Sequence, residues 1–188
     1  MRKVVSWLFI SLDGVVEAPN EWQFDVFDDT MIADLGSQME SEGAMLMGRV
    51  SYQEWASYWP ASTDEPYASH INKLPKYVVS TTLDDVEWGK WEKPTLIKGN
   101  LAAEINQLKQ LPGKNIGVGG SPTLVRSLIQ ENLLDEFKLM IHPVIVGKGK
   151  RLFTEDLNLE RLQLVDSKVT GTGVVIVTYQ PAKGENEK

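Results

Sequence analysis

The residue pattern with the clearest chemical meaning is Gly119-Gly120-Ser121-Pro122-Thr123, which follows a strand-like run and precedes a helical stripe. Glycines let the backbone come close to a ligand, and a helix N-terminus offers free N–H groups and a favourable dipole to phosphate. Ser121 stands where a helix cap is expected, with Pro122 at the first helical position. The motif is not a Rossmann fingerprint, because Pro122 takes the place of the third glycine. It predicts either a phosphate site or a tight strand-to-helix connection without a ligand.

Two shorter motifs also follow predicted strands. Gly48-Arg49, with Ser51, precedes a predicted helix, and Arg49 carries a planar fork suited to bidentate phosphate binding. Ser80-Thr81 places hydroxyl groups after the next strand. Each motif alone is also typical of an ordinary solvated arginine or a turn. Because ligands of open α/β sheets bind at the carboxyl ends of the strands, the three motifs together favour a phosphate-bearing ligand.

The elements that must position these motifs alternate along the chain before a final run of strands. Strands are predicted at residues 3–11, 44–47, 76–80, 95–97, 115–118, 137–146, 161–170 and 174–179. Helices are predicted at 29–40 and 50–57, between Asn100 and Pro112, and around 122–129. This order predicts an α/β protein with three layers (α/β/α), whose mixed, mostly parallel sheet ends in an antiparallel hairpin. Pro143 lies inside the sixth predicted strand, so we expect a bulge or an edge there.

Size and composition limit the classes of function. The 188 residues suit one domain, predicted over residues 1–181 with a polar tail at 182–188. A net charge of -7 argues against a general nucleic-acid or anionic-membrane surface, since no excess cation is available to neutralise phosphates. Cysteine is absent, and the only two histidines, His70 and His142, are far apart in sequence. We therefore expect no metal site, and we interpret His142 as part of a strand.

The start of the chain has two interpretations. Met1-Arg2-Lys3 followed by a short apolar run has the form of a signal peptide, or of a buried first strand. The strand is favoured, because Asp13-Gly14 closes the run as a turn would. No stretch approaches the roughly 18 apolar residues of a membrane span. We therefore expect a cytoplasmic protein without a membrane or nucleic-acid partner.

Taken in order, the motifs resemble those of the dihydrofolate-reductase-like superfamily. The closest branch is that of the C-terminal reductase domain of the bacterial riboflavin-biosynthesis protein. The resemblance runs from about residue 3 to residue 179, nearly the whole chain. It rests on Ser11-Leu12-Asp13-Gly14, Met47-Gly48-Arg49-Val50-Ser51-Tyr52, Val79-Ser80, Gly119-Gly120 with Leu124, Leu134-Asp135-Glu136-Phe137, and the segment from His142 to Phe153.

The resemblance implies the mixed sheet of dihydrofolate reductases and an NADPH-dependent reductase, with hydride passing to a C=N or C=O carbon of a small pteridine- or pyrimidine-like substrate. It places Arg49 with Ser80 or Thr81 at the 2′-phosphate, and Ser11 and Val16 near the nicotinamide. The pyrophosphate and its surroundings would be contacted by Gly48, Arg49, Ser51, Gly119, Gly120, Ser121, Thr123 and Leu124. The substrate pocket would lie over residues 19–31, with Trp22, Asp25 and Asp28 as substrate-binding candidates. A carboxylic acid, Asp13 or Asp28, or a bound water would supply the proton.

Several positions depart from the riboflavin-pathway pattern. Val15 and Val118 stand where those enzymes carry lysine and glutamate, and no Asp-Asp-Pro segment follows Tyr52. The cofactor site therefore stays plausible while the phosphorylated aminouracil substrate becomes doubtful. Three alternatives stay open: 5-amino-6-(5-phosphoribosylamino)uracil reductase, a dihydrofolate reductase, or a non-catalytic nucleotide-binding protein. A homodimer is expected, because long apolar strands at the end of the chain leave an edge that needs pairing.

Overall fold

The computed structural model describes residues 1–155 and 157–182, which form one eight-stranded sheet in the order β4-β3-β2-β5-β1-β6-β8-β7. The six strands from β4 to β6 are parallel, and β8 and β7 add an antiparallel edge. The strands are β1 Val4–Ser11, β2 Glu42–Gly48, β3 Lys76–Val79, β4 Thr95–Ile97, β5 Asn115–Val118, β6 Glu136–His142, β7 Leu162–Val169 and β8 Val175–Pro181.

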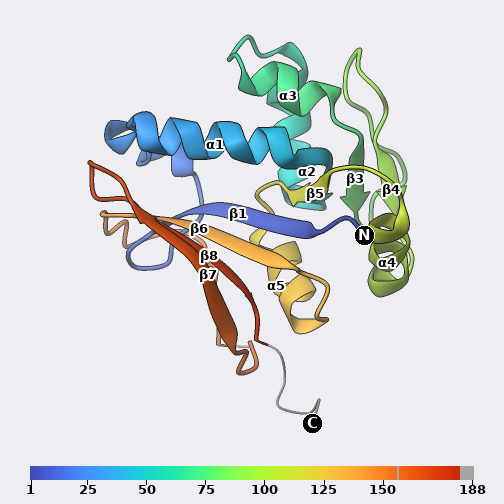
Figure 1. Ribbon diagram of the computed structural model, residues 1–188. Helices are drawn as coiled ribbons and strands as arrows, with labels where there is room; N and C mark the ends of the chain where they lie inside the picture. Colours follow the sequence, from blue (N-terminus) through green and yellow to red (C-terminus); the bar gives the residue numbers. More distant parts are fainter. Residues whose placement is uncertain (156, 183–188) are drawn as a thin grey trace.

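Helices cover both faces of this sheet (Figure 1). They are α1 Asp29–Ser41, α2 Arg49–Tyr58, α3 Tyr67–Lys73, α4 Leu101–Gln110 and α5 Pro122–Gln130, with short 3-10 turns at Pro19–Glu21, Phe24–Val26 and Trp59–Ala61. Helices α4 and α5 pack on one face through the largest apolar cluster, whereas α1, α2 and α3 pack on the other through two smaller clusters. The predicted three-layer α/β fold with a mostly parallel sheet and a C-terminal hairpin is confirmed.

The sequence placed the end of the sixth strand wrongly. The strand was predicted to continue to residue 146, but β6 ends at His142, immediately before Pro143. Proline has no N–H to give to a sheet ladder. The chain turns instead toward the end of β1, where the Leu12 N–H donates to the Val144 carbonyl at 2.9 Å and the Val146 N–H donates to Oδ1 of Asp13 at 3.0 Å.

Two further expectations concern the chain as a whole. Within the described residues, none of the helices is long and apolar enough to cross a membrane. The polar tail predicted at 182–188 lies outside the described residues, except for residue 182.

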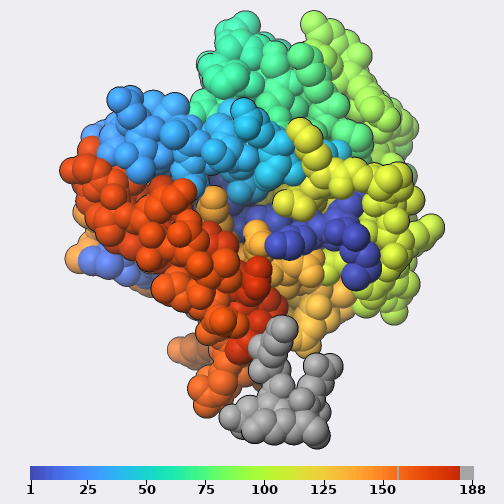
Figure 2. Space-filling view, in the orientation of Figure 1, coloured from blue at the N-terminus to red at the C-terminus, as the bar shows by residue number. Residues whose placement is uncertain are grey.

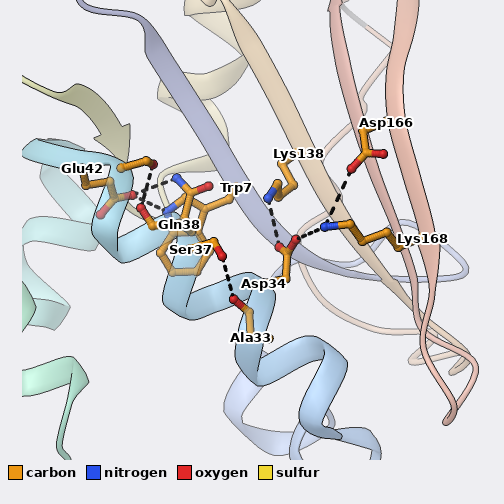
Figure 3. A network of polar contacts seen from close by, with 10 residues as sticks. Trp7, Ala33, Asp34, Ser37, Gln38, Glu42, Lys138, Asp166 and Lys168 are labelled. Atoms are coloured by element: carbon orange, nitrogen blue, oxygen red, sulfur yellow. Dashed lines mark hydrogen bonds and ion pairs between the residues drawn. The ribbon is translucent and has the colours of Figure 1, made fainter.

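A buried polar network joins α1 to the sheet on the face opposite α4 and α5 (Figure 3). Asp34 of α1 is 6% exposed, and its carboxylate accepts from Nζ of Lys138 at 2.9 Å and of Lys168 at 3.2 Å. Farther along, the buried carboxylate of Glu42 accepts from Trp7 Nε1 at 2.8 Å and pairs with His70 at 2.9 Å. These carboxylates tie α1 and the start of β2 to β1, β6, β7 and α3 through hydrogen bonds and ion pairs.

Replacing Asp34 by alanine should destabilise the fold by about 3 kcal/mol, because Lys138 is left half-buried without its counter-charge. The double variant Asp34→Leu/Lys138→Met should recover most of that loss, since it removes both charges. Urea unfolding measures both values. A single variant as stable as the wild type would show that the ion pair adds nothing to the packing of α1.

Candidate functional site

The carboxyl ends of the parallel strands meet along one edge and bring the three predicted motifs together. Gly48, the last residue of β2, pairs with Val79 of β3, so Arg49 and Ser80 leave neighbouring strands side by side. The ladder between β1 and β5 ends at Ser6, whereas the ladder between β1 and β6 continues to Ser11. The turn after β5 therefore lies at a step in this edge, beside the part of β1 that does not pair with β5.

Two of the motifs are held to each other by hydrogen bonds. The Gly48 N–H donates to Oγ of Ser121 at 2.9 Å, and the Ser121 N–H donates to Oγ of Ser51 at 2.8 Å. The Ser121 hydroxyl in turn donates to the Gly119 carbonyl at 2.9 Å. Ser51 and Ser121 are both buried. Their side chains therefore fix the relative position of the N-termini of α2 and α5.

Beyond the Gly48 and Ser121 N–H groups, the N–H groups in the first turns of α2 and α5 have no side-chain caps. Asp28 caps α1 and Asn100 caps α4, each through a side-chain oxygen that accepts a backbone N–H. At α2 the cap position is Gly48, and at α5 it is Ser121, which makes no capping hydrogen bond. Ser121 and Pro122 occupy the predicted cap and first helical positions, but the Ser121 side chain does not cap the helix, because its φ of 57° is left-handed and its hydroxyl holds the neighbouring turn. Both helices thus direct uncapped N–H groups and the positive ends of their dipoles to one edge.

The two glycines of the longest motif are required by their surroundings. A Cβ on Gly119 would stand 3.1 Å from the ring of Trp55, and one on Gly120 would stand 3.1 Å from Oγ of Ser51. Gly120 also has a φ of 55°, which side-chain-bearing residues adopt at a cost. A bare backbone therefore faces the edge between α2 and α5.

The side chains of the remaining cofactor candidates fall into two groups. Arg49, Thr81 and Thr123 are exposed and offer donors to a ligand. The others shape the loops: Ser80 accepts from the N–H groups of Thr82 and Leu83, Ser11 accepts from the Val15 N–H, and Val16 and Leu124 are buried. Of the two residues expected at an extra phosphate beside Arg49, Thr81 is the better placed to donate.

The sequence interpretation missed a second cation at this edge. Lys98 follows β4, and the carbonyl of the preceding residue, Ile97, accepts the Ser80 N–H at 3.0 Å. Its ammonium pairs with the exposed carboxylate of Asp84 at 2.9 Å. A single lysine after a three-residue strand gives no distinctive sequence signal. Only the order of the strands places it near Ser80.

Asp13, one of the two predicted proton donors, is occupied by the loop it holds. Its carboxylate accepts from the Ser11 hydroxyl at 2.7 Å and from the N–H groups of Val146 and Gly147 at 3.0 and 2.9 Å, and Arg151 lies 3.2 Å away. The hydrogen bonds from Ser11 and Val146 lower the pKa of Asp13 to about 2. A carboxyl group that stays ionised at neutral pH has no proton to give, so the geometry argues against this role.

The pKa of Asp13 also predicts a pH dependence of stability. Because the pKa is lowered by folding, the ionised carboxylate stabilises the protein above pH about 4 and loses that contribution as the pH falls toward 2. Asp13→Asn should therefore lower the melting temperature at pH ~6, and the difference from the wild type should shrink as the pH approaches ~2. Calorimetric scans across that range test this. A difference that is independent of pH would mean that the charge of Asp13 is not what holds the loop.

The other candidate acids and Trp22 lie on the α1 side of the β1 end. Asp28 accepts from the Met31 N–H at 3.0 Å and from the Gly171 N–H at 2.8 Å, so it caps α1 and ties it to the β7–β8 hairpin. Asp25 is exposed, and its negative charge raises the pKa of His142, although burial of the ring is the larger influence and lowers it. Trp22 packs edge-on against His142 at 5.3 Å between ring centroids. The structure thus brings two predicted substrate residues to a histidine that the sequence interpretation treated only as strand.

Comparison with known proteins gives a family and a fold. The sequence matches the family model described as the RibD C-terminal domain over residues 2–176. It is 33% identical over 184 residues to the protein YyaP of Bacillus subtilis (strain 168), covering 95% of this chain and 94% of that protein.

Solved structures share the fold at lower identity. A putative riboflavin biosynthesis protein from Shewanella sp. PV-4 superposes with a TM-score of 0.79 at 23% identity, covering 96% of this chain and 99% of that one. Dihydrofolate reductase from Enterococcus faecalis, complexed with NADP(H), superposes with a TM-score of 0.64 at 12% identity, covering 96% and 97%. The chain therefore shares the fold of both proteins over nearly its whole length.

Proposed function

The chain belongs to the RibD C-terminal domain family, and from this premise we propose that it is an NADPH-dependent reductase of a small unsaturated molecule. The observation that carries the proposal is the meeting of two uncapped helix N-termini, a bare glycine backbone and Arg49 at one edge of the sheet. Such an edge offers the N–H donors and the cation that the phosphates of a dinucleotide need. The dihydrofolate reductase of the same fold was solved with NADP(H), which supports the same cofactor here.

In this proposal the chain binds and orients the cofactor. The N-termini of α2 and α5 would hold the pyrophosphate, while Arg49 and Thr81, with Lys98 nearby, would hold the 2′-phosphate. Bound NADPH would supply a hydride from C4 of its nicotinamide. The rest of the chain would place the acceptor carbon within about 3.5 Å of that position and exclude water.

The substrate is proposed to differ from those of the two related reductases. Val15 and Val118 stand where the riboflavin-pathway pattern has lysine and glutamate, and both side chains are apolar and fully buried. They offer no partner to a phosphate or to a polar pyrimidine edge. Asp28, one candidate for holding a pterin, is already engaged with the Met31 and Gly171 N–H groups. We therefore expect poor turnover of both the phosphorylated aminouracil and dihydrofolate.

The test follows the loss of NADPH absorbance with a panel of small oxidised heterocycles and carbonyl compounds, next to those two substrates. Turnover of a panel member with NADPH supports the proposal. A specificity constant above about 10⁴ M⁻¹s⁻¹ for the aminouracil or dihydrofolate would assign the chain to that enzyme instead. Tight NADPH binding without turnover of any compound would favour the non-catalytic nucleotide-binding alternative.

A homodimer is proposed because β7, the last strand of the sheet, has a free edge. All eight residues of β7 are exposed, among them Leu164, Val165 and Val169 at 51%, 52% and 69%. Figure 2 shows these last strands, in orange and red, at the surface next to α1. Because an exposed apolar edge strand is open to pairing, we propose that it is covered by a second copy.

Light scattering at micromolar concentration should give twice the chain mass of 21.1 kDa, and Val165→Glu should shift the protein toward the single-chain mass. A wild-type particle of single-chain mass would overturn the dimer.

A further inference from the structure

The imidazole of His142 is the most unusual polar group in the described part of the chain. It is fully buried at the carboxyl end of β6, directly beside Ser11 of β1. Neither Nδ1 nor Nε2 has a hydrogen-bond partner among the described residues. Buried side-chain nitrogen and oxygen atoms nearly always have a partner, so two unpartnered nitrogens on one ring call for an explanation.

The surroundings of His142 are aromatic. The ring of Phe9 lies edge-on at 5.7 Å between centroids, and that of Trp22 at 5.3 Å. Trp22 belongs to the segment between β1 and α1, and its indole N–H donates to the Glu17 carbonyl at 3.1 Å. Flat aromatic walls around a polar ring suit a flat ligand, because such rings stack or meet edge to face.

A second unpartnered polar atom lies in the segment between β1 and α1 that carries Trp22. Gln23 follows Trp22, is 7% exposed, and its Oε1 has no partner among the described residues. The segment is anchored at its C-terminal end, where Asp28 caps α1 and accepts the Gly171 N–H. Gln23 and His142 thus both carry buried hydrogen-bonding atoms without a partner among the described residues.

Burial keeps the imidazole of His142 neutral at physiological pH. Burial lowers its pKa from the usual 6.5, and the nearby charge of Asp25 opposes this only in part. The one lysine of β6, Lys138, is already paired with Asp34. The carboxylate of Asp13, after β1, is already bound by the N–H groups of the 146–147 turn. A neutral imidazole offers one N–H donor and one acceptor nitrogen. A charged ligand group here would lose its hydration without gaining an opposite charge.

We propose that His142, assisted by Gln23, is the specificity-determining residue of the substrate pocket. Its ring nitrogens would recognise an uncharged, flat molecule that carries a donor and an acceptor on one edge and lies against Trp22. This inference rests on the proposed reductase function, whose substrate side it specifies. It assigns to the pocket a preference for neutral flat rings over anionic flat rings.

The experiment uses the full chain, with and without saturating NADPH, and two probes of matched flatness. Lumazine is an uncharged two-ring heterocycle, and orotate is a flat anionic ring. We expect the wild type to bind lumazine at least about tenfold more tightly than orotate. We also expect His142→Phe to weaken lumazine by about tenfold, since it keeps an aromatic ring but removes both nitrogens. NADPH binding should stay within about twofold in that variant, because His142 lies on the α1 side of β1, away from the phosphate edge.

Nuclear magnetic resonance gives a readout that needs no variant. The chain has only two histidines, so ¹⁵N-labelled imidazole signals of His142 and His70 are resolved and His70→Gln assigns them. Lumazine should shift the His142 nitrogens and leave those of His70 in place. Gln23→Leu serves as a second variant, with a smaller loss of lumazine affinity.

The outcomes separate this inference from the function on which it rests. Unchanged lumazine affinity in His142→Phe, unshifted His142 signals, or equal binding of lumazine and orotate would each overturn the role of His142. Failure of the wild type to bind lumazine at all would overturn the ligand class. Failure to bind NADPH while lumazine binds through His142 would instead overturn the proposed reductase and leave this pocket standing.

Discussion

Arg49→Ala is expected to weaken NADPH binding by about 10- to 100-fold and to leave NADH binding nearly unchanged. The guanidinium of Arg49 is exposed at the first position of α2 and donates a 3.1 Å hydrogen bond to the side-chain oxygen of Gln53. It is therefore available to an additional phosphate, and only NADPH carries one. Charge-assisted hydrogen bonds of this kind contribute about 1.5–3 kcal/mol.

Calorimetric titration of both cofactors measures this difference. Arg161→Ala is a suitable control, because it removes an exposed arginine next to β7. This strand lies at the other end of the strand order from β2 and β3. Lys98→Ala should show a smaller loss with the same preference, since its ammonium is shared with Asp84. Equal losses of NADPH and NADH in Arg49→Ala would show that Arg49 does not read the 2′-phosphate.

Gly120→Val is expected to abolish cofactor binding, because a branched side chain would stand between the N-termini of α2 and α5. The variant also has a cost for the fold. Its φ of 55° disfavours a side chain by roughly 1–2 kcal/mol, and its Cβ would press on Oγ of Ser51. The expected result is a folded but less stable protein that no longer binds NADPH.

A matched variant separates strain from blocked binding. Gly113 also has a positive φ, 135°, but it precedes β5 and so lies at the opposite edge of the sheet, where an added Cβ meets only Arg2 at 3.6 Å or more. Gly113→Val should lose stability and keep its NADPH affinity. If Gly120→Val stays folded by circular dichroism and binds NADPH normally, the glycine pair is only a connector.

Much of the fold follows from local patterns that the packing does not override. The stripe of Leu101, Ile105 and Leu108, with Asn100 before it, predicts a capped helix, and α4 begins there with Asn100 as its cap. The glycine-rich link at 171–173 predicts a hairpin, and β7 and β8 pair across it. These features depend on neighbours in sequence, so composition and spacing are sufficient to find them.

The roles of particular side chains depended on contacts between distant residues. Ser121 has the type and position of a cap, but Gly48, 73 residues earlier in the chain, gives its N–H to that hydroxyl. Asp13 has the type of a proton donor, but hydrogen bonds from Ser11 and from the turn at 146–147 lower its pKa to about 2. His142 lies in a strand as predicted, but its aromatic surroundings were not predicted, because Phe9 and Trp22 come from other segments. The contacts of Ser121, Asp13 and His142 all depend on how distant segments come together in the fold, and no single motif predicts that arrangement.

A crystal structure of the chain grown with NADPH tests the central claim most directly. We expect the pyrophosphate between the N-termini of α2 and α5, the 2′-phosphate within hydrogen-bond reach of Arg49, and the nicotinamide beside the end of β1 near Ser11. NADPH bound elsewhere on the chain, or an unoccupied edge at a saturating concentration, would contradict the proposed cofactor site.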